Sequence, residues 1–241
     1  MSRNLKTDTE LLPRSGKSVT FKEMTGYEED LLTDRKMMKS GKAIEKFLSG
    51  CIVELDGNSD VTENDVLSLF TTDRVFLMIK IRQLSYGDII EQAEVTCPNE
   101  NCGEKNYLTI NLSELPETIA DDTDGDKLYT IDIEEEGIKL TFRDLVGKDE
   151  QKLFKVQPSE AMSVGTAIRL VEVIDNGETV HPNGVIKWYK GLPARLRNLI
   201  RSEMEKVQVG IDSAITVKCD NCGQEWKIQV ETLRSFFFPG M

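Results

Sequence analysis

The sequence predicts an α+β fold. It comprises a helical N-terminal part, two β-hairpins that each carry a pair of cysteines, and an α+β subdomain inserted between the hairpins. Three observations support this. Apolar residues recur at helical spacing before residue 90. Apolar and polar residues alternate on both sides of each cysteine pair. The stretch that separates the two pairs is far longer than the loop of a compact zinc ribbon, and is long enough to hold a subdomain.

The composition limits the classes of protein that the chain can belong to. The 241 residues carry a formal net charge of −12, with a pI near 4.8. Because an acidic surface is repelled by phosphates, we expect neither a nucleic-acid nor a membrane partner. The chain has no run of about eighteen apolar residues, and its polar start lacks the apolar region of a secretory signal. The fifth cysteine, Cys51, has no spare partner, and with a metal on the other four cysteines this fits a protein of a reducing cytoplasm.

The first part of the chain is expected to be an arm followed by helices. Residues 1–20 are polar and predict a flexible N-terminal arm. Residues 21–90 are expected to form the helical region. There, Thr25-Gly-Tyr-Glu28 has the pattern of a capping box, which predicts the start of a helix. Apolar spacing predicts another helix over 43–51, and a mostly apolar run over 73–84 predicts a helix at the centre of the core.

Two later segments repeat one pattern of strand, cysteine turn and strand. We predict a first knuckle hairpin over 91–116, and a second knuckle hairpin with an aromatic tail over 211–241. Ala93-Glu-Val-Thr-Cys97 leads into the first turn, and Ala214-Ile-Thr-Val-Lys-Cys219 leads into the second. The duplicated context indicates that the two turns are related parts of one site.

The inserted subdomain is expected to span 117–210. Residues 128–134 and 138–142 alternate around Glu135-Glu-Gly137 and predict a β-hairpin. In this hairpin Tyr129 or Thr130 and Ile131 would lie opposite Leu140 or Phe142. The rest of the subdomain is expected to be mostly helical. The candidate helices are Lys148–Val156, Ser159–Ile174 and Pro193–Val207.

The four paired cysteines predict one structural zinc ion per chain. Zinc in a closed structural site takes four ligands, and Cys97, Cys102, Cys219 and Cys222 supply four thiolates. The glycine after each pair lets backbone N–H groups turn toward the sulfurs. A redox pair is less well supported, because the second pair does not open a helix after a buried strand. A catalytic zinc would need an open coordination position, which four cysteines fill.

Little else in the sequence suggests chemistry. The fifth cysteine, Cys51, lies in an apolar segment and is expected to be a buried small residue. The only histidine, His181, lies in a turn sequence, and no nucleophile elbow or phosphate-binding glycine loop is present. The acidic loop 121–126 could suggest calcium, but it lacks the closing Glu of an EF-hand, so a solvated turn is favoured. We therefore expect a binding or structural protein and not an enzyme.

The end of the chain carries three consecutive phenylalanines. Phe236, Phe237 and Phe238 would be costly to expose to water. They either pack back onto the core or dock onto another subunit, and residue chemistry alone leaves both alternatives open. They are therefore candidate partner-binding residues.

Two motifs carry a resemblance to a known family. Phe21-Lys-Glu-Met-Thr-Gly-Tyr-Glu28-Glu29-Asp-Leu-Leu-Thr33 resembles the opening motif of the baseplate hub and hub-assembly proteins of T-even-type contractile-tailed bacteriophages. Asp73-Arg-Val-Phe-Leu-Met-Ile-Lys-Ile-Arg82-Gln-Leu-Ser-Tyr-Gly87-Asp88, which runs into Cys97-Pro-x-x-x-Cys102-Gly103, is similar to the central signature of that family. The similarity covers residues 18–115 well, and the second half matches mainly through its returning cysteine pair.

The resemblance implies a role in building the tail baseplate, as a hub component or as a chaperone of hub assembly. Its implied partners are other baseplate and tail proteins in a hetero-oligomeric assembly. The implied locations are the host cytoplasm during assembly and the tail baseplate of the virion. The resemblance brings no catalytic residues. Two alternatives remain. One is a zinc-knuckle nucleic-acid-binding regulator, which the net charge of −12 opposes. The other is an enzyme of unrecognised type.

Overall fold

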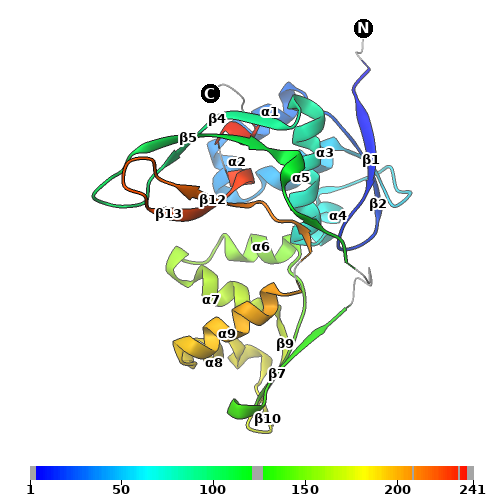
Figure 1. Ribbon diagram of the computed structural model, residues 1–241. Helices are drawn as coiled ribbons and strands as arrows, with labels where there is room; N and C mark the ends of the chain where they lie inside the picture. The colour runs from blue at the N-terminus through cyan, green and yellow to red at the C-terminus, as the bar shows by residue number, and fades with distance from the viewer. Residues whose placement is uncertain (1–3, 121–126, 208, 233, 238–241) are drawn as a thin grey trace. The chain divides into compact units, whose positions relative to one another are not determined.

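The computed structural model describes residues 4–120, 127–207, 209–232 and 234–237. The chain forms two compact units. The first unit contains Met1–Val66, Thr72–Ala120 and Val209–Met241, and the second contains Leu67–Thr71 and Asp121–Gln208. Figure 1 shows the elements of both. Among the described residues, no helix has the length and apolar character needed to cross a membrane.

The N-terminal residues form a sheet, where a flexible arm over 1–20 was expected. The antiparallel strands are ordered β1-β2-β3, with β1 at Thr7–Leu11, β2 at Ser18–Lys22 and β3 at Ile52–Leu55. The turn between β1 and β2 is anchored in the core. The backbone N–H groups of Arg14 and Ser15 donate to the carboxylate of Asp73, which is fully buried. These long-range hydrogen bonds explain why a polar segment is ordered.

Helices occupy most of the segment from Gly26 to Tyr86, with β3 between α3 and α4. Their bounds are Gly26–Thr33 (α1), Arg35–Ser40 (α2), Ala43–Cys51 (α3), Glu63–Ser68 (α4) and Thr71–Tyr86 (α5). The capping box is present, because Thr25 donates through its backbone N–H and its hydroxyl to the carboxylate of Glu28. Gly41 ends α2 in the left-handed conformation, with φ +71°. Helix α5 buries residues on most of its sides, as its apolar run predicted.

The two knuckle hairpins belong to the first unit. The first consists of β4 (Ile89–Thr96) and β5 (Lys105–Asn111), and the second of β12 (Ala214–Lys218) and β13 (Glu225–Gln229). A short ladder joins β6 (Glu117–Thr118) to β11 (Gly210–Ile211), and both strands belong to the first unit. The final described helix is α10 (Arg234–Phe237). Single turns of 3-10 helix cover Leu112–Glu114, Glu134–Glu136, Pro182–Gly184 and Val230–Thr232.

The second unit is an antiparallel sheet packed against helices. The strand order is β10-β9-β8-β7, with bounds Glu178–Thr179 (β10), Leu170–Asp175 (β9), Ile138–Phe142 (β8) and Tyr129–Ile133 (β7). The expected hairpin register is confirmed, because Tyr129 lies opposite Phe142 and Ile131 opposite Leu140. The helices are Gly147–Leu153 (α6), Pro158–Arg169 (α7), Val185–Gly191 (α8) and Ala194–Glu205 (α9).

The helix expected over Ser159–Ile174 is a helix only as far as Arg169. The residues that follow form β9, which pairs with β8 over most of its length. Val171, Val173 and Ile174 are β-branched and favour an extended backbone. Val173 is fully buried in the core of the unit, beside residues of β8 and α9. The sheet therefore contains an interior strand, β9, in a segment that the apolar spacing of the sequence predicted to be helical.

Candidate metal centre

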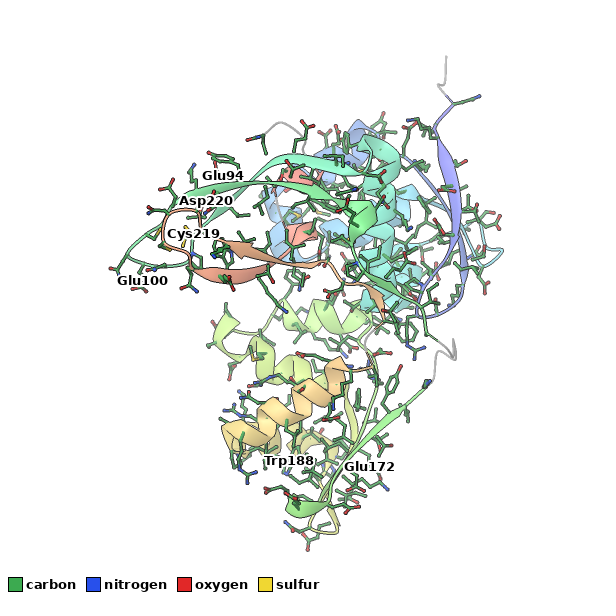
Figure 2. The ribbon with its side chains drawn as sticks, in the orientation of Figure 1. Glu94, Glu100, Glu172, Trp188, Cys219 and Asp220 are labelled. Atoms are coloured by element: carbon green, nitrogen blue, oxygen red, sulfur yellow. The ribbon has the colours of Figure 1, made fainter. Side chains whose placement is uncertain are left out.

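The four paired cysteines lie together at the tips of the two knuckle hairpins. Cys97 and Cys102 flank the turn between β4 and β5, and Cys219 and Cys222 flank the turn between β12 and β13. All four sulfurs lie within 4.8 Å of one another. Figure 2 labels Cys219 in this cluster, with Glu94, Glu100 and Asp220 nearby.

Both turns are closed by the same kind of backbone hydrogen bond. The N–H of Cys97 donates to Glu104 and the N–H of Cys219 donates to Gln224, each at 2.8 Å, so each hairpin closes immediately behind its cysteine pair. Gly103 and Gly223 have φ of +62° and +72°, a conformation that costs glycine little. The sequence repeat thus corresponds to a structural repeat.

Asparagines support the cysteines across the two hairpins. Asn99, in the first turn, points its amide nitrogen at the sulfur of Cys222, 3.9 Å away. Asn221, in the second turn, points its amide nitrogen at the sulfur of Cys102, 3.5 Å away. Each asparagine stands two residues after the first cysteine of its own pair. That shared position is the sequence signal from which this reciprocal pair could have been found.

Asn106 is a further supporting residue that sequence reasoning missed. It lies on β5 and is buried, yet its side chain reaches the second hairpin. Its carbonyl oxygen accepts from the backbone N–H of Asp220 at 3.0 Å, and its amide nitrogen lies 3.8 Å from the sulfur of Cys219. Asn106 therefore sets the position of one hairpin relative to the other.

Two of the sulfur–sulfur separations match those around a tetrahedral zinc ion. A zinc–sulfur bond of about 2.3 Å places neighbouring sulfurs of a tetrahedron about 3.8 Å apart. The sulfurs of Cys97 and Cys222 are 3.7 Å apart, and those of Cys102 and Cys219 are 3.8 Å apart. These separations far exceed the roughly 2.05 Å of a disulfide, and the cysteines are free thiols. The site can hold a metal ion, and all four donors are soft sulfurs.

The thiols differ in acidity before any ion is considered. Backbone N–H donors from Cys222 and Asn221 lower the pKa of Cys219 to about 6. Burial and the neighbouring cysteine sulfurs raise the pKa of Cys97 to about 12. A divalent cation stabilises thiolates, so its binding would displace the proton from Cys97.

The sequence of the chain is similar to one known family of phage proteins. A sequence model of the family described as T4 bacteriophage base plate protein matches residues 4–238, which is nearly the whole chain. The chain belongs to this family. No curated protein and no solved structure matches it. The suspected phage baseplate resemblance is confirmed. Membership supports a structural role in the baseplate, contacts with other phage tail proteins and a place in the virion tail.

Two of the three C-terminal phenylalanines, Phe236 and Phe237, pack inward, which is the first of the two alternatives that the sequence left open. Phe236 and Phe237 are buried, with ring centroids 4.6 Å apart, and Phe237 packs edge-on against Phe47 of α3 at 5.1 Å. The buried guanidinium of Arg82 donates to the backbone carbonyl of Phe236. Burial of two large rings favours docking on the chain's own core. Phe238 lies outside the described residues.

The remaining sequence candidates do not add to the site. Cys51 is fully buried, as expected, and burial raises the pKa of its thiol to about 12. His181 is exposed, and its ring nitrogen accepts from the backbone N–H of Asn183, which is turn chemistry. The acidic loop 121–126 lies outside the described residues.

Proposed function

We propose that this baseplate protein acts in the hub region of a contractile phage tail, as a component of the hub or as a factor in its assembly. It would act through contacts with neighbouring proteins, and a structural Zn²⁺ held by Cys97, Cys102, Cys219 and Cys222 would stabilise it. The observation that supports the metal site is that four cysteine sulfurs lie within 4.8 Å of one another, with two separations of 3.7 and 3.8 Å that match tetrahedral spacing. The family match and the motif resemblance carry the baseplate part.

The proposed role of the zinc is to join two hairpins that are distant in sequence. Each hairpin is a two-stranded sheet, and such a sheet is marginal by itself in water. Four sulfurs leave no open coordination position, so the ion would be structural. The free energy of metal binding then adds to the free energy of folding of the first unit.

Cysteine variants test the zinc. We expect one zinc per chain by elemental analysis of freshly purified, reduced protein. Cys219→Ser should lose the zinc and lower the thermal stability of the first unit. Cys51→Ser is the matched control, because it removes a buried thiol outside the cluster. It should keep the zinc and cost about 1–3 kcal/mol of stability for a buried hydroxyl. A zinc content near zero in the wild type would refute the metal assignment.

Mass spectrometry tests the hub role. A hub component should be present in purified tails, and an assembly factor should be present in hub intermediates. Absence of the chain from both would contradict the proposal. A salt-sensitive gel shift with DNA or RNA at physiological ionic strength would instead favour the nucleic-acid-binding regulator.

A further inference from the structure

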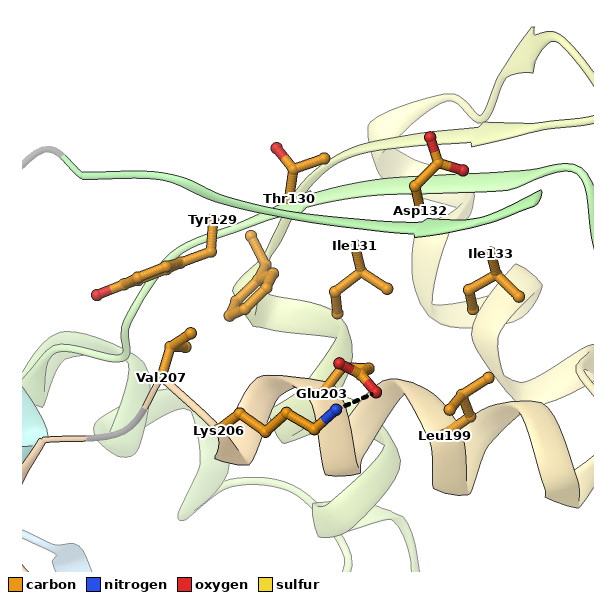
Figure 3. Close-up of a pocket in the computed structure, with 10 residues that line it drawn as sticks. Tyr129, Thr130, Ile131, Asp132, Ile133, Leu199, Glu203, Lys206 and Val207 are labelled. Atoms are coloured by element: carbon orange, nitrogen blue, oxygen red, sulfur yellow. Dashed lines mark hydrogen bonds and ion pairs between the residues drawn. The ribbon is translucent and has the colours of Figure 1, made fainter.

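The cysteine cluster of the first unit is more reactive than the open groove of the second unit. That groove lies between β7 and α9 and has a volume of about 440 Å³. In Figure 3 Thr130 and Asp132 point to the face of the sheet away from α9. The charged side chains of Glu203 and Lys206, which line the groove, bind each other at 2.6 Å. The groove is therefore mainly apolar, whereas the cysteine cluster gathers four nucleophilic groups.

The four cysteines differ in how far solvent reaches them. Cys97 and Cys219 are buried, with 3% and 2% of their surface exposed, and Cys102 is half-buried. Cys222 is exposed. A thiolate reacts with an oxidant or an alkylating agent only where the reagent can reach it. Cys222 is therefore the cysteine that a reagent from solution meets first.

Cys97 is well placed to react next. Its sulfur lies 3.7 Å from the sulfur of Cys222 and belongs to the other hairpin. The competitor within the second turn is Cys219, whose sulfur accepts from the backbone N–H groups of Asn221 and Cys222. Among the described residues, one backbone N–H, that of Asn99, donates to the sulfur of Cys97. Because such bonds stabilise a thiolate and a stabilised thiolate attacks more slowly, Cys97 is the stronger nucleophile of the two.

We propose that Cys222 is an oxidation site, at which hydrogen peroxide converts the proposed zinc site into a disulfide between Cys97 and Cys222. The thiolate of Cys222 attacks one peroxide oxygen and forms a sulfenic acid, and hydroxide leaves. The thiolate of Cys97 then attacks that sulfur, forms the S–S bond and expels a second hydroxide. Two protons from solvent neutralise the two hydroxides. The two thiolates together lose two electrons, and one peroxide becomes two waters.

The disulfide would join the same two hairpins that the proposed zinc joins. The two sulfurs must approach by about 1.7 Å to reach the bond length of about 2.05 Å. Both cysteines flank turns at the hairpin tips, where the backbone is least constrained by the sheet. Cys102 and Cys219 remain as thiols, and two sulfurs do not complete a four-ligand structural site, so the zinc is released. The release of zinc rests on the proposed function, whereas the S–S bond needs only the two thiols.

This conversion suits a protein that folds in a reducing compartment and then works outside it. Thiols persist in the cytoplasm, and disulfides persist in oxidising surroundings such as the surface of a virion. The family match supports a place in the virion tail. The hairpins would thus be joined by zinc during assembly and by a disulfide in the released particle.

Peroxide treatment of the zinc-loaded full chain tests this inference. Cleavage after Glu100 and before Asp220 separates the four paired cysteines, so mass spectrometry of unreduced digests identifies each disulfide. Equimolar peroxide should release zinc in proportion to the disulfide, and the main linked peptides should carry Cys97 and Cys222. Cys51, which is fully buried, is the internal control and should stay reduced. A disulfide mainly within one hairpin, or oxidation that begins at a cysteine other than Cys222, would overturn the inference.

Two serine variants separate the disulfide from the zinc. Cys97→Ser and Cys102→Ser each remove one proposed zinc ligand from the same turn, so both should bind zinc poorly. Cys102→Ser keeps the reacting pair and should still form the disulfide. Cys97→Ser should lose it, and the sulfenic acid of Cys222 should persist long enough for dimedone to trap it. Equal yields of a disulfide to Cys222 in the two variants would contradict the inference. A reduced wild type without zinc would refute the proposed zinc alone, because the comparison of the two variants does not depend on it.

Discussion

Replacement of Asn106 is the sharpest test of how the two hairpins would hold the proposed zinc ion. Asn106→Leu keeps the approximate size of a buried side chain and removes both of its polar contacts with the second hairpin. These contacts are the bond from the backbone N–H of Asp220 at 3.0 Å and the approach to the sulfur of Cys219 at 3.8 Å. The four sulfur ligands themselves remain.

The structure sets the size of the effect. Residues that orient metal ligands typically contribute about 10- to 100-fold to metal affinity, which is about 1.4–2.8 kcal/mol. Asp220 is exposed, so water can replace part of its lost bond. Asn106 itself is only 3% exposed, so water cannot replace its contact with the sulfur of Cys219. Because only this second contact is lost in full, we expect the zinc affinity to fall by an amount near the lower end of the range, about 10- to 30-fold.

Competition with a chelator measures this loss as a change in zinc affinity. Asn111→Leu is the matched control. It makes the same substitution at the end of the same strand, where the side chain of Asn111 accepts from the backbone N–H of Ser113 and does not reach the cysteines. It should leave zinc affinity unchanged. The reasoning fails if Asn106→Leu binds zinc as tightly as the wild type, or if Asn111→Leu loses as much.

Two further substitutions and one control substitution test the two units separately. Phe237→Ala removes a ring that is 7% exposed and should cost the first unit about 3–5 kcal/mol in denaturant unfolding. Phe154→Ala, which removes a ring that is 58% exposed, should change stability by no more than about 0.5 kcal/mol, and equal effects would contradict the inward docking. In the second unit, burial acts to raise the pKa of Asp149, but bonds from Arg143 and Lys152 outweigh it and hold that pKa below the usual 3.8. Its stabilisation should be complete above about pH 4 and should disappear as the pH falls through the lowered value. Asp149→Asn should therefore cost about 1–3 kcal/mol at neutral pH and progressively less below pH 4, as followed by thermal unfolding. A pH-independent cost would contradict this assignment.

Elements with strong local signals were well predicted. The capping box at Thr25, the apolar run in α5 and the hairpin register of β7 and β8 all depend on neighbours within a few residues. The grouping of the cysteines also followed from local repetition, because each turn is closed by its own backbone bond. Local interactions of this kind are readable because the same few residues both specify and form them.

Elements held by distant partners were missed. β1 is polar, and only its pairing with β2, together with the anchoring of the following turn by Asp73, makes it ordered. β9 follows α7 without a break, and its place beside β8 ended the helix. Tertiary contacts override local propensity in such segments.

The sequence alone determined that four cysteines in two matching turns form one group, and that the chain resembles phage baseplate proteins. Residue type and spacing were sufficient for both conclusions. Only the tertiary structure decided that Asn106 braces the second hairpin, that Phe236 and Phe237 turn inward, and that β7 is left at an edge. These three outcomes depend on which surfaces meet after the chain folds, and a contact between residues far apart in sequence leaves no local pattern from which to predict it.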